Sequence, residues 1–225
     1  MSRLTNFKSF ALSVATLILL SVTTAKAETI VIVGVDTGQA STATVECTFN
    51  GQTNTLTFTI TNTSHITSPG STSTITGIGF DLPPGGNASA SGLDGFTGMQ
   101  APSLGSNFTF SDGDLGNVPH GFGTTVLDFG FITGTNFAGG MVSDGLLPGE
   151  SASFTVSGAA FAGLTEAEIC NAIFVRFQNV PTGEGSDVGV PTDVPEIPEP
   201  ASMLLLGTGL IGVMGIVRRK LKTRN

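Results

Sequence analysis

The chain has 225 residues, and its 17 Asp and Glu residues outnumber its 9 Lys and Arg residues, which gives a formal net charge of −8 at pH 7. All the acidic residues lie between Glu28 and Glu199, whereas the basic residues other than Arg176 lie near the two ends of the chain. The segment between the two ends is so acidic that it would repel phosphate groups, which excludes nucleic acid as a partner. Cations, basic surfaces and neutral polymers remain possible partners.

Residues 1–27 predict a secretory signal peptide. Basic residues open this segment, an uncharged apolar run follows, and Ala25 and Ala27 supply small residues at the cleavage site. These are the three parts of a cleaved leader. We therefore expect the secretion machinery to export the chain.

The body, residues 28–190, predicts a single all-β domain, a β-sandwich or jelly roll. Residues 55–61 alternate between threonine and an apolar residue, which is the period of a half-buried strand. Similar stretches bounded by turn residues predict strands at 29–35, 42–50, 54–62, 73–80, 107–112, 124–132, 151–158 and 173–180. The core is expected to be filled by Phe58, Phe80, Phe110, Phe129, Phe131, Phe154, Phe174 and Phe177.

One short helix and one disulfide are expected in this domain. Residues 164–172 predict one or two helical turns, with Thr165 as the N-cap and acidic residues in the first turn. Cys47 and Cys170 are the only cysteines, and two thiols in an exported chain tend to form a bridge. Two separate buried thiols are the alternative, because sequence does not show proximity.

Several short motifs suggest catalysis or metal binding without the partners that these functions need. Asp36-Thr37-Gly38 resembles the active-site loop of aspartic proteases, but those enzymes use two such aspartates and no second copy occurs. A plain turn accounts for the motif equally well. Oxygen ligands for Ca²⁺ are offered by Ser111, Asp112, Asp114, Glu184 and Asp187, although their spacing fits no EF-hand loop.

The remaining charged and titratable residues predict structural roles. His65 and His120 lie in turn-like surroundings without a nearby nucleophile pattern, so we expect them in polar loops. Arg176 is expected to pair with a carboxylate and to stabilise the fold. No metal site, cofactor or catalytic residue is predicted.

The C-terminal segment predicts an extended stalk followed by a membrane anchor. Prolines recur over residues 191–200, and an uncharged stretch runs from Ala201 to Val217. At 1.5 Å per residue this stretch is just long enough to span a thin bilayer as a helix. A basic cluster follows at residues 218–220, Arg218, Arg219 and Lys220, and it would keep the tail, 218–225, in the cytoplasm.

The order of these three parts resembles the PEP-CTERM sorting signal. Pro198-Glu199-Pro200 precedes a Leu- and Gly-rich membrane stretch, and the basic cluster closes the sequence. The resemblance covers about the last thirty residues. It implies recognition at Pro198, Glu199 and Pro200 by an exosortase, a membrane-embedded cysteine protease or transpeptidase of bacteria that make exopolysaccharide. The segment 175–191 also looks like the one that commonly precedes this signal.

The sequence therefore predicts a non-enzymatic protein of the cell surface or extracellular matrix, anchored in the membrane during transit. An adhesin or a weak, calcium-assisted polysaccharide-binding module is the alternative, with extracellular polysaccharide as the partner. The absence of Trp and Tyr disfavours sugar stacking. A hydrolase, either a single-Asp protease or a carboxylate-pair glycosidase, is the third interpretation.

Overall fold

A computed structural model describes residues 27–65, 70–83, 95–101, 106–113, 115–123, 125–181 and 185–192. These residues belong to the first of two compact units, which ends at Thr192. Their strands are β1 (Glu28–Gly34), β2 (Gly38–Asn50), β3 (Thr55–Asn62), β4 (Thr74–Phe80), β5 (Phe96–Gln100), β6 (Thr109–Asp112), β7 (Phe129–Ile132), β8 (Ser151–Gly158), β9 (Ile173–Gln178) and β10 (Ser186–Thr192). Their helices are the 3-10 turns η1 (Val142–Asp144) and η2 (Ala159–Phe161) and the α-helix α2 (Glu166–Cys170).

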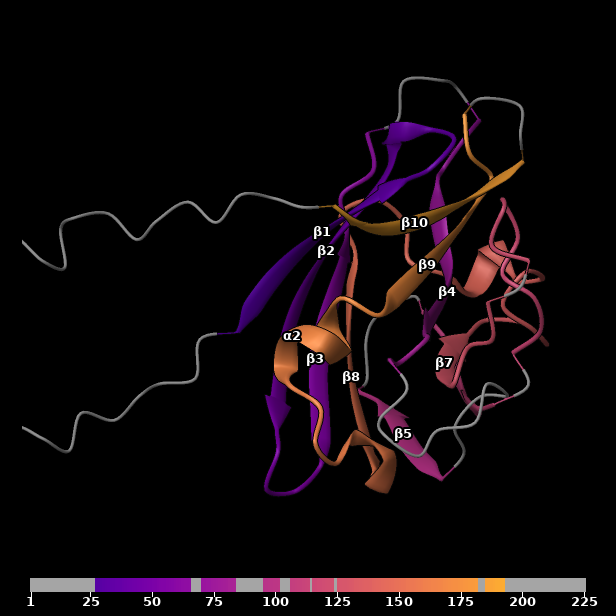
Figure 1. The fold of residues 1–225 in the computed structure, drawn as a ribbon. Helices are drawn as coiled ribbons and strands as arrows, with labels where there is room; N and C mark the ends of the chain where they lie inside the picture. The colour runs from indigo at the N-terminus through magenta and orange to yellow at the C-terminus, as the bar shows by residue number, and fades with distance from the viewer. Residues whose placement is uncertain are drawn as a thin grey trace, which may run out of the picture. The chain divides into compact units, whose positions relative to one another are not determined.

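The strands form one antiparallel sheet, so the predicted all-β class is confirmed. The predicted β-sandwich or jelly roll would have two packed sheets, whereas the described strands belong to a single one. The sheet has ten strands in the order β5-β8-β3-β2-β1-β10-β9-β4-β7-β6. It curves so that β1, β2, β3 and β8 lie on one side in Figure 1 and β9, β4 and β7 on the other. A single continuous sheet therefore supplies both walls of the core.

Phenylalanine rings fill the space between these walls. Phe58 alternates with threonines along β3, and its ring packs against those of Phe80, Phe131 and Phe154. Of the eight predicted core phenylalanines, six are fully buried, whereas Phe110 and Phe174 are only partly buried. Four further rings are buried that the sequence analysis did not assign to the core: Phe96, Phe108, Phe137 and Phe161.

A second, smaller core lies on the outer face of β4, β7, β9 and β10. The chain on either side of β7 covers this face with Leu115, Val118, Leu127 and Phe137, which pack with Ile132 and Val188. The covering chain lies so close that a Cβ on Gly79 would come within 2.5 Å of Leu127. Every residue of β4 is consequently buried, because both faces of that strand are covered.

Side chains bridge the gap between the two edge strands, β5 and β6. Asp112 Oδ2 accepts hydrogen bonds from the backbone N–H groups of Gly95 at 3.0 Å and Phe96 at 3.3 Å. Gln100 Oε1 accepts one from the Phe108 N–H at 2.9 Å. These bonds satisfy edge groups that would otherwise be open to pairing with another chain.

The predicted helix and disulfide are both present. Helix α2 begins with a capping box, in which Thr165 and Glu168 exchange side-chain and backbone hydrogen bonds. Cys170 at its end is bonded to Cys47 of β2. The bridge joins residues 123 positions apart in the sequence.

Two strands differ from the sequence analysis. Strands β5 and β10 both fall in stretches for which no strand was predicted, and β10 also runs to Thr192, past the predicted start of the stalk at residue 191. Strand β10 lies between β1 and β9 in the middle of the sheet. It tolerates Pro191 because β9 pairs only with residues 186–189, so the proline has a neighbouring strand on one side alone.

Candidate functional site

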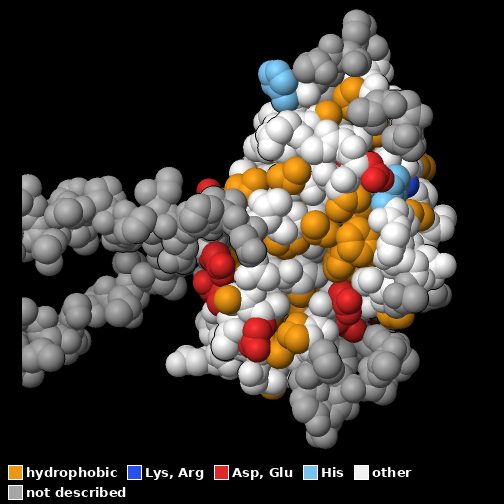
Figure 2. Space-filling view, turned by 45° about the horizontal axis from the view of Figure 1, so that its top comes forward, with side chains coloured by type: hydrophobic (Ala, Val, Ile, Leu, Met, Phe, Trp, Pro, Cys, Tyr) orange, Lys and Arg blue, Asp and Glu red, His pale blue; other side chains and the backbone are white. Residues whose placement is uncertain are grey.

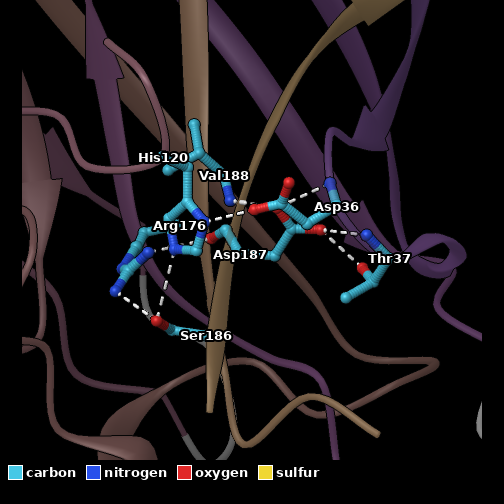
Figure 3. Close-up of polar contacts among 7 residues, drawn as sticks. All are labelled: Asp36, Thr37, His120, Arg176, Ser186, Asp187 and Val188. Carbon is cyan, nitrogen blue, oxygen red and sulfur yellow. Dashed lines mark hydrogen bonds and ion pairs between the residues drawn. The ribbon is translucent and has the colours of Figure 1, made fainter. Parts of the chain in front are cut away.

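A cluster of polar side chains lies where the turn between β1 and β2 meets the start of β10. Figure 3 shows its members, which we call the Asp187 cluster: Asp36, Thr37, His120, Arg176, Ser186 and Asp187. Strands β9 and β10 supply three of them, the turn supplies two, and His120 comes from the chain that covers the outer face. Segments far apart in the sequence are therefore joined here.

Asp187 is fully buried and holds the turn in place. Its Oδ1 accepts from the backbone N–H groups of Asp36 at 3.3 Å and Val188 at 2.7 Å. Its Oδ2 accepts from the N–H of Thr37 at 2.9 Å and from the Thr37 hydroxyl at 2.5 Å. Hydrogen bonds to an ionised carboxylate are stronger than neutral ones, so this carboxylate fixes the turn to β10.

The turn sequence fits this carboxylate closely. A Cβ on Gly34 would lie 2.2 Å from Asp187 Oδ2, so any larger residue there would displace the carboxylate. Gly38 ends the turn with a φ of +56°, a conformation that glycine adopts without a steric penalty. The glycines on either side of Asp36 and Thr37 thus allow the turn to fold around Asp187.

His120 connects the covering chain to the turn and to β10. Its Nδ1 contacts Asp36 Oδ2, and its Nε2 lies 3.4 Å from Ser186 Oγ. The His120 side chain is 15% exposed and that of Asp36 is 47% exposed. His120 has a φ of +61°, a left-handed conformation that costs a residue other than glycine about 1 kcal/mol.

Arg176 supports the cluster from beneath. It is only 5% exposed, and it donates from Nη2 to Ser186 Oγ at 2.6 Å and from Nη1 to the Asp187 carbonyl oxygen at 3.3 Å. Burial lowers the pKa of the guanidinium, and the nearby negative charge of Asp187 partly opposes that effect. The expected pairing with a carboxylate takes a weaker form here, because the described hydrogen bonds of Arg176 go to a hydroxyl and a backbone carbonyl oxygen, and Asp187 acts on it only through its charge.

The order carboxylate, imidazole, hydroxyl in Asp36, His120 and Ser186 is also the order of a serine hydrolase triad. Here the Ser186 hydroxyl already accepts a short hydrogen bond from Arg176, and its 3.4 Å distance to His120 is longer than an ordinary hydrogen bond. The Asp36 side chain is also 47% exposed, whereas the orienting acid of such a triad is buried. These contacts favour structural or cation-binding chemistry over nucleophilic attack.

The structure brings together residues that the sequence analysis treated separately. Asp36 and Thr37 form the expected turn, and the carboxylate that they face is Asp187, about 150 positions later. The candidate calcium ligands Asp112 and Asp187 do not share a site, because three strands separate β6 from β10. In the sequence, Asp187 is only an acidic residue within a β-rich stretch, and nothing near it indicates that it is buried.

The predicted sorting and membrane residues lie outside the described residues. These are the leader with Ala25, the motif Pro198-Glu199-Pro200, the stretch from Ala201 to Val217, and the basic cluster Arg218, Arg219 and Lys220. Ala27 of the predicted cleavage site is the first described residue. Among the described residues, none of the helices has the length and hydropathy needed to cross a membrane.

Comparison with protein families identifies the C-terminal segment. Residues 196–220 match the family model of the PEP-CTERM protein-sorting motif. No curated protein and no solved structure matches the chain. The match therefore concerns the delivery of the protein and leaves the chemistry of the β domain to be inferred from its own residues.

Proposed function

Because the chain carries a PEP-CTERM sorting motif, we propose that it is an exported protein of the cell surface or extracellular matrix, processed by an exosortase-type enzyme and without catalytic activity of its own. The motif match at residues 196–220 is the observation on which this proposal rests. Its host is a bacterium that produces exopolysaccharide.

Each part of the C-terminal segment has its own role: recognition, anchoring or orientation in the membrane. Pro198 and Pro200 lack backbone N–H groups and have restricted φ angles, which favours an extended chain at Glu199. A protease can bind an extended chain along its backbone. The apolar stretch from Ala201 to Val217 anchors the precursor, and the basic cluster that begins at Arg218 keeps the tail in the cytoplasm.

Two features of the β domain are typical of exported proteins. Its two cysteines form a disulfide, which persists in oxidising compartments. Acidic side chains contribute to its surface, as Figure 2 shows for one face, and a large net negative charge favours solubility. These features support an exported destination, and they do not depend on a ligand.

The sorting proposal is tested by replacing Pro198, Glu199 and Pro200 with alanine. Expressed in a host that carries an exosortase, the wild-type chain should lose its C-terminal segment, and the triple variant should remain uncut in the membrane fraction. The C-terminal mass of the purified protein measures both outcomes. Pro195→Ala is the matched control, because Pro195 lies just before the matched residues 196–220.

Two results would contradict the proposal. The triple variant would be processed to the same mass as the wild type, or the wild type would be processed equally in a host whose exosortase has been deleted. Retention of the Pro195→Ala variant in the membrane would show that the whole stalk, rather than the motif, determines processing.

A further inference from the structure

We propose that Asp36, His120 and Asp187 form a binding site for a divalent transition-metal ion of the zinc type. Each of the three offers one ligand atom, and these atoms lie within 4.8 Å of one another. In a tetrahedral site with bonds of about 2.1 Å, ligand atoms are about 3.4 Å apart. Small side-chain rotations at Asp36 and His120 would therefore bring all three atoms to coordination distance.

The ligand types select the class of ion. An imidazole nitrogen combined with carboxylate oxygens suits Zn²⁺, Co²⁺ and Ni²⁺, whereas Ca²⁺ and Mg²⁺ prefer oxygen ligands alone. Three protein ligands also leave a fourth position of a tetrahedral zinc ion for water or for a group of a partner molecule. The site differs from the oxygen-only calcium ligands considered in the sequence analysis.

Asp187 can provide a ligand atom despite its hydrogen bonds. The bond from the Asp36 N–H to Oδ1 is 3.3 Å long, which exceeds the usual range for such bonds. The other three bonds to this carboxylate are 2.5 to 2.9 Å long. Loss of the long Asp36 bond alone would therefore free Oδ1 to contact a cation, while its 2.7 Å bond from Val188 and both bonds to Oδ2 stay in place.

Solvent can reach the site, and neighbouring residues hold its ligands in place. Asp36 is half exposed and opens the cluster to solvent, whereas Asp187 is buried and fixed. Arg176 and Ser186 hold the start of β10 from behind through hydrogen bonds to each other and to the Asp187 backbone. Such supporting bonds orient the direct ligands and raise the affinity for metal.

The charges near the site also favour a cation. Arg176 is the only Lys or Arg between residues 27 and 217, and its guanidinium contacts the Ser186 hydroxyl and the Asp187 carbonyl oxygen. Its charge is balanced by the Asp187 carboxylate, which leaves Asp36 to offset the ion. The acidic body raises the local concentration of cations further.

Titration calorimetry with Zn²⁺ on the mature protein, purified without a polyhistidine tag and freed of metal, tests the proposal. We expect saturable binding of one ion per chain. His120→Asn and Asp36→Asn should each weaken this binding by more than about tenfold. Asparagine tolerates the left-handed backbone at residue 120, so His120→Asn should keep the turn folded.

His65→Asn is the matched control, because His65 is the only other histidine and is exposed after β3. It should bind Zn²⁺ like the wild type. Co²⁺ should bind the wild type with the visible absorption of a tetrahedral complex, and His120→Asn should abolish that spectrum.

Three outcomes would overturn the proposal: no saturable Zn²⁺ binding by the wild type, unchanged binding by His120→Asn, or stronger binding of Ca²⁺ than of Zn²⁺. With either of the first two outcomes, the cluster is only a hydrogen-bonded connection between segments; with the third, the domain prefers an oxygen-binding cation to a zinc-type ion. This test is independent of the sorting experiment, because all three ligands lie in the β domain.

Discussion

The disulfide between Cys47 and Cys170 should contribute a large part of the stability of the β domain. Its two residues are 123 positions apart, and closing a loop of that length removes about 5 kcal/mol of unfolded-state entropy at 25 °C. The free energy of unfolding of a whole domain is about 5 to 15 kcal/mol. Removal of the bridge should therefore leave the domain close to its unfolding threshold.

Urea unfolding of the mature protein, followed by circular dichroism, measures this contribution. Cys47→Ala, Cys170→Ala and the double variant are compared with the oxidised and the reduced wild type. If the cross-link acts through the unfolded chain, each single variant loses nearly as much as the double variant. The slope of unfolding free energy against urea should also rise, because an unbridged unfolded chain exposes more surface.

Local packing predicts a different pattern. Both half-cystines are about 1% exposed, so losses caused by missing packing would add up from the single variants to the double variant. An additive series, or a reduced wild type within about 1 kcal/mol of the oxidised protein, would refute the loop-entropy explanation.

Three further changes test the contacts that hold the fold. Thr165→Ala removes the N-cap of α2 and should lower the free energy of unfolding by about 1 kcal/mol; no change in urea unfolding would contradict the capping argument. Asp112→Ala should lower the free energy of unfolding by about 1 to 2 kcal/mol, because the gap between β5 and β6 loses its bridging carboxylate. Hydrogen exchange at the Phe96 amide should become faster, and unchanged exchange would show that this bridge is dispensable. Arg176→Met should lower the free energy of unfolding by about 1 to 3 kcal/mol, because the Ser186 hydroxyl and the Asp187 carbonyl oxygen lose their buried donor. An unchanged thermal midpoint would show that these two hydrogen bonds are dispensable.

Local patterns in the sequence were sufficient for the elements whose structure depends on nearby residues. The Thr and apolar alternation of β3 and the capping box after Leu164 both act over a few positions. The disulfide was predictable for another reason, since two cysteines in an exported chain leave one possible pairing. The class of the fold followed from the repetition of such strands.

Long-range contacts account for what the sequence did not reveal. Strand β10 contains Pro191 and two other residues, Gly189 and Asp187, that are uncommon in strands, and only pairing with β1 and β9 on either side makes it a strand. The Asp187 cluster is hidden for the same reason, because Thr37 and its partner Asp187 are 150 positions apart. Neither residue has a neighbour in sequence that would predict the other.

The place of β10 in the sheet has a consequence for the timing of assembly. Strand β1 enters the growing chain first, yet one of its two neighbours is the last strand to be made. Until residues 186–192 emerge, β1 and β9 both present open edges, and the two halves of the sheet have no hydrogen-bonded connection through β10. A chain that crosses a bilayer from its N-terminus would thus complete its sheet only when nearly all of the domain has passed through, so factors that shield unpaired strands would matter most during translocation.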